Sequence, residues 1–239
     1  MNTNKNSYII IYSAILVVVV AFLLAFVYAA LKPQQDINVA LDKKKQILAS
    51  LNIRDLSDAE AAAKYTEVVE CDEIIDTNAT VINKGEKGGE SAGFKLNSAD
   101  LKEGKLAVYV CNVDGEKKYV IPVYGMGLWG SIWGYIALDA DKNTIYGAYF
   151  DHQGETAGLG AEIKDSKAWQ DLFKGKKIFS ADGAAVAIAV KKASDVKNPA
   201  SEVDAVTGAT LTSDGVSLML QECFSKYVTF LKKDRKSVV

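Results

Sequence analysis

The sequence has few of the residues on which common catalytic and metal sites depend. It contains a single histidine, His152, and three cysteines that lie far apart, at positions 71, 111 and 223. Most zinc sites need several such ligands, and a Ser–His hydrolase needs its histidine beside a nucleophile and an acid. The sequence has no CxxC pair, so the usual ligands of iron–sulfur clusters and c-type haem are missing. We therefore expect neither a metal site nor a hydrolytic active site.

The sequence also lacks an excess of charge of either sign. Its 28 basic and 30 acidic residues are mixed along the chain, and the net charge is −2. Without a basic stripe there is no support for nucleic-acid binding. The three cysteines are expected to be small buried hydrophobic residues, although one disulfide would be possible in an oxidising compartment.

One long apolar run stands out near the N-terminus. No residue from 9 to 31 is charged, and at about 1.5 Å per residue such a helix crosses a bilayer core of about 30 Å. A cleaved signal peptide is the alternative, but its apolar part is usually about 7–15 residues long. We therefore predict a transmembrane anchor surrounded by lipid. The flanking lysines do not decide its orientation, because long domains translocate largely regardless of charge.

Beyond the anchor, the patterns predict helices first and then an α+β fold. Apolar spacing indicates a helix at 36–51, and Ser57 with Glu60 forms a capping box for a helix at 59–69. A mobile loop is expected at 83–93, strand pairs at 106–113 with 118–124 and at 132–138 with 144–150, a short helix at 164–173, a buried strand at 184–190 and a helix at 213–231 capped by Ser213 or Thr212. The predicted parts are a tail at 1–8, the anchor at 9–31, a helical connecting region at 32–70, an α+β domain at 71–231 and a tail at 232–239.

The segment before the last helix has the features of an anion site. Residues 204–213 have the sequence Asp-Ala-Val-Thr-Gly-Ala-Thr-Leu-Thr-Ser. These hydroxyls stand beside a helix N-terminus, where unpaired N–H groups and a partial positive charge favour phosphate. Gly208 and Ala209 would let an anion approach the backbone closely. From spacing alone, an ordinary hydroxyl-rich helix cap is the favoured explanation of the segment, because such residues are common at N-caps.

Residues 204–213 also resemble the attachment motif of the covalent FMN-binding domain family. In that motif the threonine after Gly-Ala, here Thr210, is esterified to the FMN phosphate, and Thr207 stands where serine is commoner. Residues 152–160, His-Gln-Gly-Glu-Thr-Ala-Gly-Leu-Gly, resemble the flavin-contacting loop of the family, with Ala157 in place of proline. The resemblance implies covalent FMN on Thr210. It also implies flavin contacts from Thr207, Gly208, Ala209, Leu211, Thr212, Glu155, Thr156, Gly158, Leu159 and Gly160.

Several side chains near these motifs have more than one interpretation. Glu155 could bond the flavin edge, order its loop or be a solvated acid, and His152 is interpreted as a polar loop residue. Trp129 could stack on the ring, although a core position is favoured for tryptophan. Trp133 and Trp169 are assigned to the core.

Two further segments are similar to the C subunits of the sodium-translocating NADH:quinone reductase. They are Gly127–Tyr135 and Leu41–Leu48. This resemblance implies an FMN-binding part at about 125–231 on the periplasmic side of a bacterial cytoplasmic membrane. It implies single-electron transfer among sibling subunits of the complex and a separate flavin transferase for attachment. Sodium movement would belong to the complex, so this chain would be a redox carrier and not a complete catalyst. The FMN subunit of the related ion-translocating ferredoxin:NAD reductase and a membrane-anchored, non-redox binding module remain alternatives.

Overall fold

The computed structural model describes residues 6–183 and 185–233, so residues 1–5 and 234–239 of the predicted tails lie outside it. The chain divides into two compact units, Met1–Lys43 and Lys44–Val239. Helix α1 (Asn6–Ser50) runs from the first into the second and includes Pro33. It is long and apolar enough to cross a membrane. The helix expected at 36–51 is thus the continuation of the anchor helix.

The second unit is built on a six-stranded antiparallel sheet with the order β2-β1-β3-β4-β5-β6. Its strands are β1 (Val69–Ile75), β2 (Val81–Lys84), β3 (Leu106–Val113), β4 (Glu116–Met126), β5 (Ser131–Leu138) and β6 (Ile145–His152). Asp114 and Gly115 turn the β3–β4 hairpin with φ values of 53° and 83°, the positive angles that tight hairpin turns require. Helices and an antiparallel sheet together confirm the predicted α+β class.

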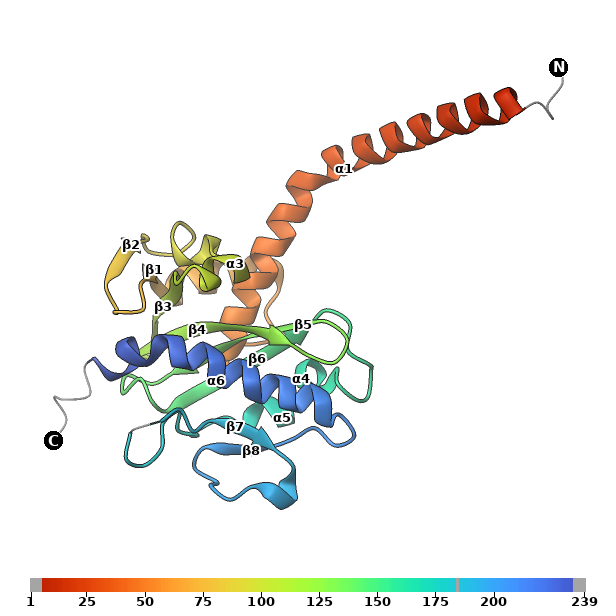
Figure 1. The fold of residues 1–239 in the computed structure, drawn as a ribbon. Helices are drawn as coiled ribbons and strands as arrows, with labels where there is room; N and C mark the ends of the chain where they lie inside the picture. The colour runs from red at the N-terminus through yellow and green to blue at the C-terminus, as the bar shows by residue number, and fades with distance from the viewer. Residues whose placement is uncertain (1–5, 184, 234–239) are drawn as a thin grey trace. The chain divides into compact units, whose positions relative to one another are not determined.

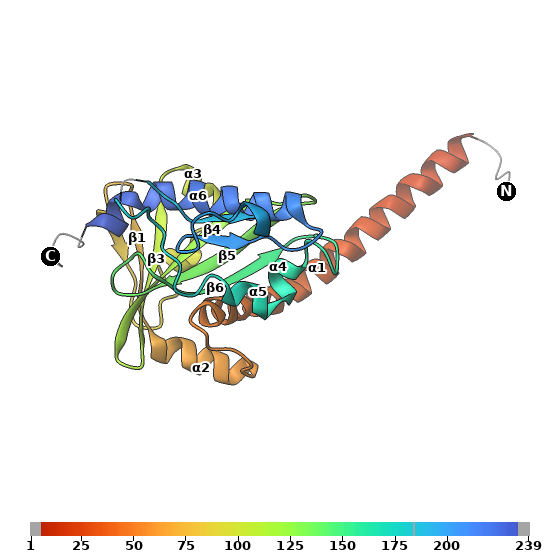
Figure 2. The same cartoon turned by 90° about the horizontal axis from the view of Figure 1, so that it is seen from below.

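Helices cover both faces of this sheet. Figures 1 and 2 show α6 (Thr210–Lys232) across one face, with the short parallel pair β7 (Ala189–Lys191) and β8 (Glu202–Asp204) beside it. Helix α2 (Asp58–Val68) and the last turns of α1 lie on the opposite face (Figure 2). The short elements α3 (Ser98–Lys102), α4 (Glu162–Asp165), α5 (Lys167–Asp171), η1 (Gly93–Lys95) and η2 (Ala193–Asp195) complete the described fold.

The main core lies between α6 and the sheet. One stripe of α6 is fully buried at Val216, Leu220, Phe224, Tyr227 and Leu231, at the spacing of one face of a helix. Burying each such side chain stabilises the fold by roughly 1.5–3 kcal/mol. Ile47, Leu48, Leu51, Ala61 and Tyr65 are similarly buried and belong to α1, the turn after it and α2. The compact unit therefore begins within the predicted connecting region.

Three local predictions are corrected by the structure. The helix expected at 164–173 is two short helices, because Ser166 ends α4 and its hydroxyl accepts the Trp169 N–H at 3.2 Å to cap α5. Of the strand expected at 184–190, only Ala189 and Val190 belong to β7, and Ala184 lies outside the described residues. The expected loop at 83–93 begins inside β2.

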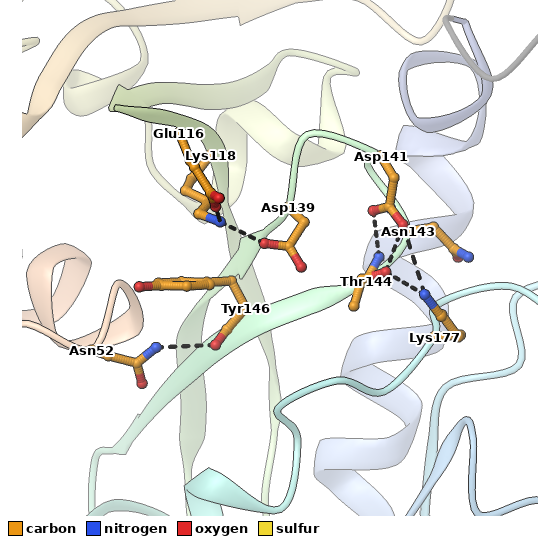
Figure 3. A network of polar contacts seen from close by, with 9 residues as sticks. All are labelled: Asn52, Glu116, Lys118, Asp139, Asp141, Asn143, Thr144, Tyr146 and Lys177. Carbon is orange, nitrogen blue, oxygen red and sulfur yellow. Dashed lines mark hydrogen bonds and ion pairs between the residues drawn. The ribbon is translucent and has the colours of Figure 1, made fainter. Parts of the chain in front are cut away.

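A polar network ties the ends of β4, β5 and β6 that lie away from the 127–130 loop (Figure 3). The ammonium group of Lys118, whose side chain is 5% exposed, bridges Glu116 at 2.6 Å and Asp139 at 2.7 Å and lies over the Tyr146 ring. Burial lowers the pKa of Lys118, but its hydrogen bonds to both carboxylates outweigh burial and raise it. Lys118 is therefore a charged structural residue that fixes this end of the sheet.

The cysteines match the expectation of small buried residues. Cys71, Cys111 and Cys223 are free and buried. Burial raises the pKa of Cys71 to about 11, and a thiol that stays protonated is a poor nucleophile. These residues therefore serve packing.

Candidate functional site

A hollow of about 380 Å³ lies where three segments meet at the N-terminus of α6. This volume is within the range of about 300–1,000 Å³ that is usual for small-molecule sites. The segments are the loop after β4, the loop after β6 and the start of α6. The lining residues are Leu128, Trp129, Glu155, Thr156, Leu159, Gly160, Gly208, Ala209, Thr210, Leu211 and Thr212. The hollow is thus mostly apolar, and Thr156, Thr210 and Thr212 are the hydroxyl-bearing residues of its lining.

The start of α6 leaves backbone N–H groups available at this hollow. The N-cap residue is Ala209, not the expected Ser213 or Thr212, and it offers no side-chain hydrogen bond. The N–H of Ser213 makes the first helical bond, to the Ala209 carbonyl at 3.0 Å. Because the preceding N–H groups of a helix lack helical partners, they remain free to bind an anion. Thr210 is the first residue of the helix, and not a residue ahead of it.

The four hydroxyl groups of this segment have different surroundings. Thr212 is buried and donates its hydroxyl to Glu155 at 2.6 Å, and the buried Ser213 hydroxyl accepts the Val206 N–H at 3.1 Å. Thr207 is exposed and does not line the hollow. Thr210 is half-buried and lines the hollow, and its hydroxyl has no hydrogen-bond partner among the described residues. Of these four hydroxyl groups, that of Thr210 is therefore the one most open to a reaction inside the hollow.

Thr210 also borders a second, more polar hollow on the side of β7. Its volume is about 450 Å³, and Lys191, Lys192, Lys197, Asp195 and Asp214 are among its lining residues. Backbone N–H groups of Asn198 and Lys197 and the ammonium of Lys191 bind the Glu202 carboxylate and hold its pKa at about 2. Thr210 thus stands between an apolar hollow and one with three lysines.

Glu155 joins the walls of the apolar hollow. Its side chain accepts the Trp129 N–H at 2.9 Å as well as the Thr212 hydroxyl, and Glu155 is only 7% exposed. The Glu155 N–H in turn donates to His152 Nδ1 at 3.0 Å. The interpretation of Glu155 as a solvated acid is wrong, because all three contacts place it inside the site. His152 orders the loop through its ring nitrogen.

Most of the predicted contact residues line this hollow, and a few do not. Thr207 and Gly158 lie outside the lining, and Leu128 lines it without having been predicted. Trp129 is 70% exposed, so the favoured core position for it is wrong. Trp169 is buried as expected, whereas Trp133 is half-buried and donates its ring N–H to Gln46 at 3.1 Å. Leu128 belongs to the segment Gly127–Tyr135 that resembles the family, but the sequence gives no separate sign that its side chain contacts a flavin.

Comparison with known proteins gives consistent matches. The family model for the FMN-binding domain matches residues 127–225. The chain is 33% identical to the C subunit of the Na(+)-translocating NADH-quinone reductase of Haemophilus ducreyi, over 84% of this chain and 83% of that protein. The C subunit of the same reductase from Pseudomonas aeruginosa is 30% identical, over 87% of each chain. A crystal structure of the C subunit from Parabacteroides distasonis is 41% identical, covers 84% of this chain and 96% of that one, and superposes with a TM-score of 0.76.

Proposed function

We propose, since this chain belongs to the family of C subunits of the Na(+)-translocating NADH-quinone reductase, that it passes single electrons through an FMN esterified to Thr210. Membership makes it an electron-carrying flavin subunit of that redox complex. The free hydroxyl of Thr210, facing the apolar hollow, is the observation that carries the proposed attachment.

The surroundings of Thr210 suit both ends of an FMN molecule. The first turn of α6 offers N–H groups and a partial positive charge to the phosphate, and Lys192 and Lys197 lie in the hollow behind it. The isoalloxazine would occupy the apolar hollow, against Leu159 and Leu211. A phosphodiester carries less negative charge than a free phosphate monoester, so these groups suffice to balance it. When bound, FMN accepts and donates electrons one at a time.

Attachment would form a bond between Thr210 Oγ and the flavin phosphorus. The hydroxyl loses its proton, and the leaving group of an activated flavin donor departs from the same phosphorus. In the described part of the chain no side chain hydrogen-bonds to Thr210 as a general base. We therefore propose that a separate flavin transferase performs the step. The redox partners would be other subunits of the quinone reductase complex, and α1 would contact membrane lipid.

We place the FMN domain on the outer side of the bacterial cytoplasmic membrane. A tethered flavin cannot diffuse away in a compartment without a supply of FMN, which is a reason for covalent attachment there. Alkaline phosphatase fused to the C-terminus, which is active only outside the cytoplasm, should be active. An inactive fusion on a stably expressed chain would contradict this orientation.

Gel fluorescence tests the attachment directly. The full chain, produced with a flavin transferase, should give a flavin-fluorescent band on a denaturing gel, and Thr210→Val should abolish the band. Thr207→Val is the matched control, because it removes an exposed hydroxyl three residues away, and it should stay fluorescent. A fluorescent T210V band would show that the attachment site is wrong. A wild-type chain that never becomes fluorescent would favour the non-redox binding module.

A further inference from the structure

Glu155 occupies a position in which one carboxylate fixes two walls of the apolar hollow. Its Oε1 accepts the Trp129 N–H at 2.9 Å, from the loop after β4. Its Oε2 accepts the Thr212 hydroxyl at 2.6 Å, from the first turn of α6. Trp129 and Thr212 come from different elements, so the Glu155 side chain holds them at a set distance.

The surrounding backbone is shaped to admit this carboxylate. A Cβ on Gly127 would lie 2.5 Å from Glu155 Oε1, and a Cβ on Gly160 would lie 2.5 Å from Oε2. These distances are shorter than any normal contact, so glycine at both positions lets the loops close on the carboxylate. The Glu155 backbone is fixed as well, because its N–H donates to His152 Nδ1. Position, backbone and both oxygens of Glu155 are thus determined by the fold.

The charge of Glu155 has no counterpart in the hollow. Among the residues described as lining it, Glu155 is the one that can carry a charge, and its neighbours there include Leu128, Leu159 and Leu211. In such an apolar site, charges interact more strongly than they do in water. Reduction places an added electron on the ring, and a fixed negative charge nearby opposes that addition.

We propose that Glu155 is a positioning residue of the flavin site whose negative charge lowers the reduction potential of the FMN that its hydrogen bonds help to seat. This inference rests on the proposed attachment of FMN at Thr210. It assigns two separable roles to one side chain. The hydrogen bonds set the distance between Trp129 and Thr212, and the charge sets the tendency of the ring to accept an electron.

The two roles can be separated by two substitutions. Glu155→Gln keeps the length of the side chain, and its amide can accept the Trp129 N–H and donate to the Thr212 hydroxyl oxygen. It therefore removes the charge while keeping the geometry. Glu155→Asp keeps the charge but is one methylene shorter, so it cannot reach both partners. Asp165→Asn is the control, since it removes one negative charge from an exposed position on α4.

The experiment is a redox titration of the full flavin-carrying chain in detergent. The flavin absorption spectrum monitors the extent of reduction. E155Q should keep its fluorescent band. Its equilibrium constant for one-electron reduction should be about tenfold larger than that of wild type, which is a rise of about 59 mV in the reduction potential. E155D should lose part of its attached flavin and thermal stability while keeping a potential near that of wild type. D165N should match wild type in both respects, because solvent screens an exposed charge.

Several results would overturn the inference. An unchanged potential in E155Q removes the role of the charge, and an equal rise in E155D assigns the effect to geometry instead. An E155Q chain that fails to fold or to take up flavin contradicts the claim that the amide can replace both hydrogen bonds. Each of these results requires fluorescent wild-type protein. Failure of the proposed attachment is recognised separately, because wild type itself would then lack the band.

Discussion

At the scale of single residues, the site depends on how closely its backbone approaches polar side chains. A Cβ on Gly160 would lie 2.5 Å from Glu155 Oε2 and 2.6 Å from Thr212 Oγ1. At least one of these atoms would have to move, and the hydrogen bond between them opposes that movement. In contrast, Gly154 has open space where a Cβ would be, although it belongs to the same loop.

Gly160→Ala should therefore destabilise the domain by about 1–3 kcal/mol, the usual cost of overpacking, and reduce flavin attachment. Gly154→Ala should stay within about 0.5 kcal/mol of wild type. Urea denaturation gives the stabilities, and gel fluorescence normalised to protein gives the attachment. If the two variants behaved alike, the close packing around Glu155 would not matter.

Sequence motifs could predict the residues of the site better than their environments. The roles of Thr210 and of the 152–160 loop are predictable because their local sequences are distinctive. The burial of Glu155 depends on Trp129 and Thr212, which are 26 and 57 positions away from it. An acid with no such partners would be exposed, and nothing in the local sequence distinguishes the two cases. Long-range hydrogen bonds therefore decide what the motif alone left open.

At the scale of elements, the strands of the central hairpins could be predicted and β1 could not. β3 and β4 are rich in β-branched and aromatic residues and are joined by Asp-Gly, which is a strong hairpin signal. β1 contains three acidic residues, yet Asp72 within it is fully buried. Its carboxylate accepts the N–H groups of Ala92 and Phe94 at 2.7 and 2.8 Å. The partners that make this strand possible are about twenty residues away.

The β7–β8 pair next to the lysine-lined hollow is held by a charged hydrogen-bonding group, Glu202. Its bonds to the Asn198 N–H, Lys191 and the Lys197 N–H lower its pKa to about 2 from an ordinary 4.5. The folded-state pKa is below the unfolded value. The stabilisation is therefore complete above about pH 4.5 and is lost as the pH falls through about 2.

Glu202→Gln should lower the free energy of unfolding by about 2 kcal/mol at pH 7. This difference between the variant and wild type, the gap, should become smaller as the pH falls from 4.5 towards 2. Urea denaturation at pH 7 and pH 3 measures the gap. Glu222→Gln, at an exposed position on α6, should stay within about 0.5 kcal/mol of wild type at pH 7. A gap for E202Q of the same size at both pH values would contradict this account.

At the scale of the whole molecule, the boundary of the folded domain differs from the end of the anchor. The apolar run ends at Leu31, but the compact unit begins at Lys44, still within α1. Ile47, Leu48 and Leu51 are at most 1% exposed. The sequence predicted a helix there from its apolar stripe, but it could not indicate that this stripe packs against the domain.

Two truncations test that boundary. A fragment of residues 44–239 should melt cooperatively and remain in the soluble fraction, because it lacks the apolar run and keeps the core. A fragment of residues 54–239 loses three buried side chains, each of which stabilises the fold by roughly 1.5–3 kcal/mol. Their combined contribution is comparable to the whole stability of a typical domain. It should show no cooperative transition in near-UV circular dichroism. Equal melting of the two fragments, or membrane retention of the first, would contradict the boundary.

The proposed function depends above all on the bond between Thr210 and the flavin. The most direct measurement is tandem mass spectrometry of proteolytic peptides from the full chain produced with a flavin transferase. The peptide that contains Thr210 should gain the mass of FMN less one water, with fragment ions placing the addition on Thr210 itself. An unmodified Thr210 in flavin-fluorescent protein, or the same added mass on Thr207 or Thr212, would contradict the account.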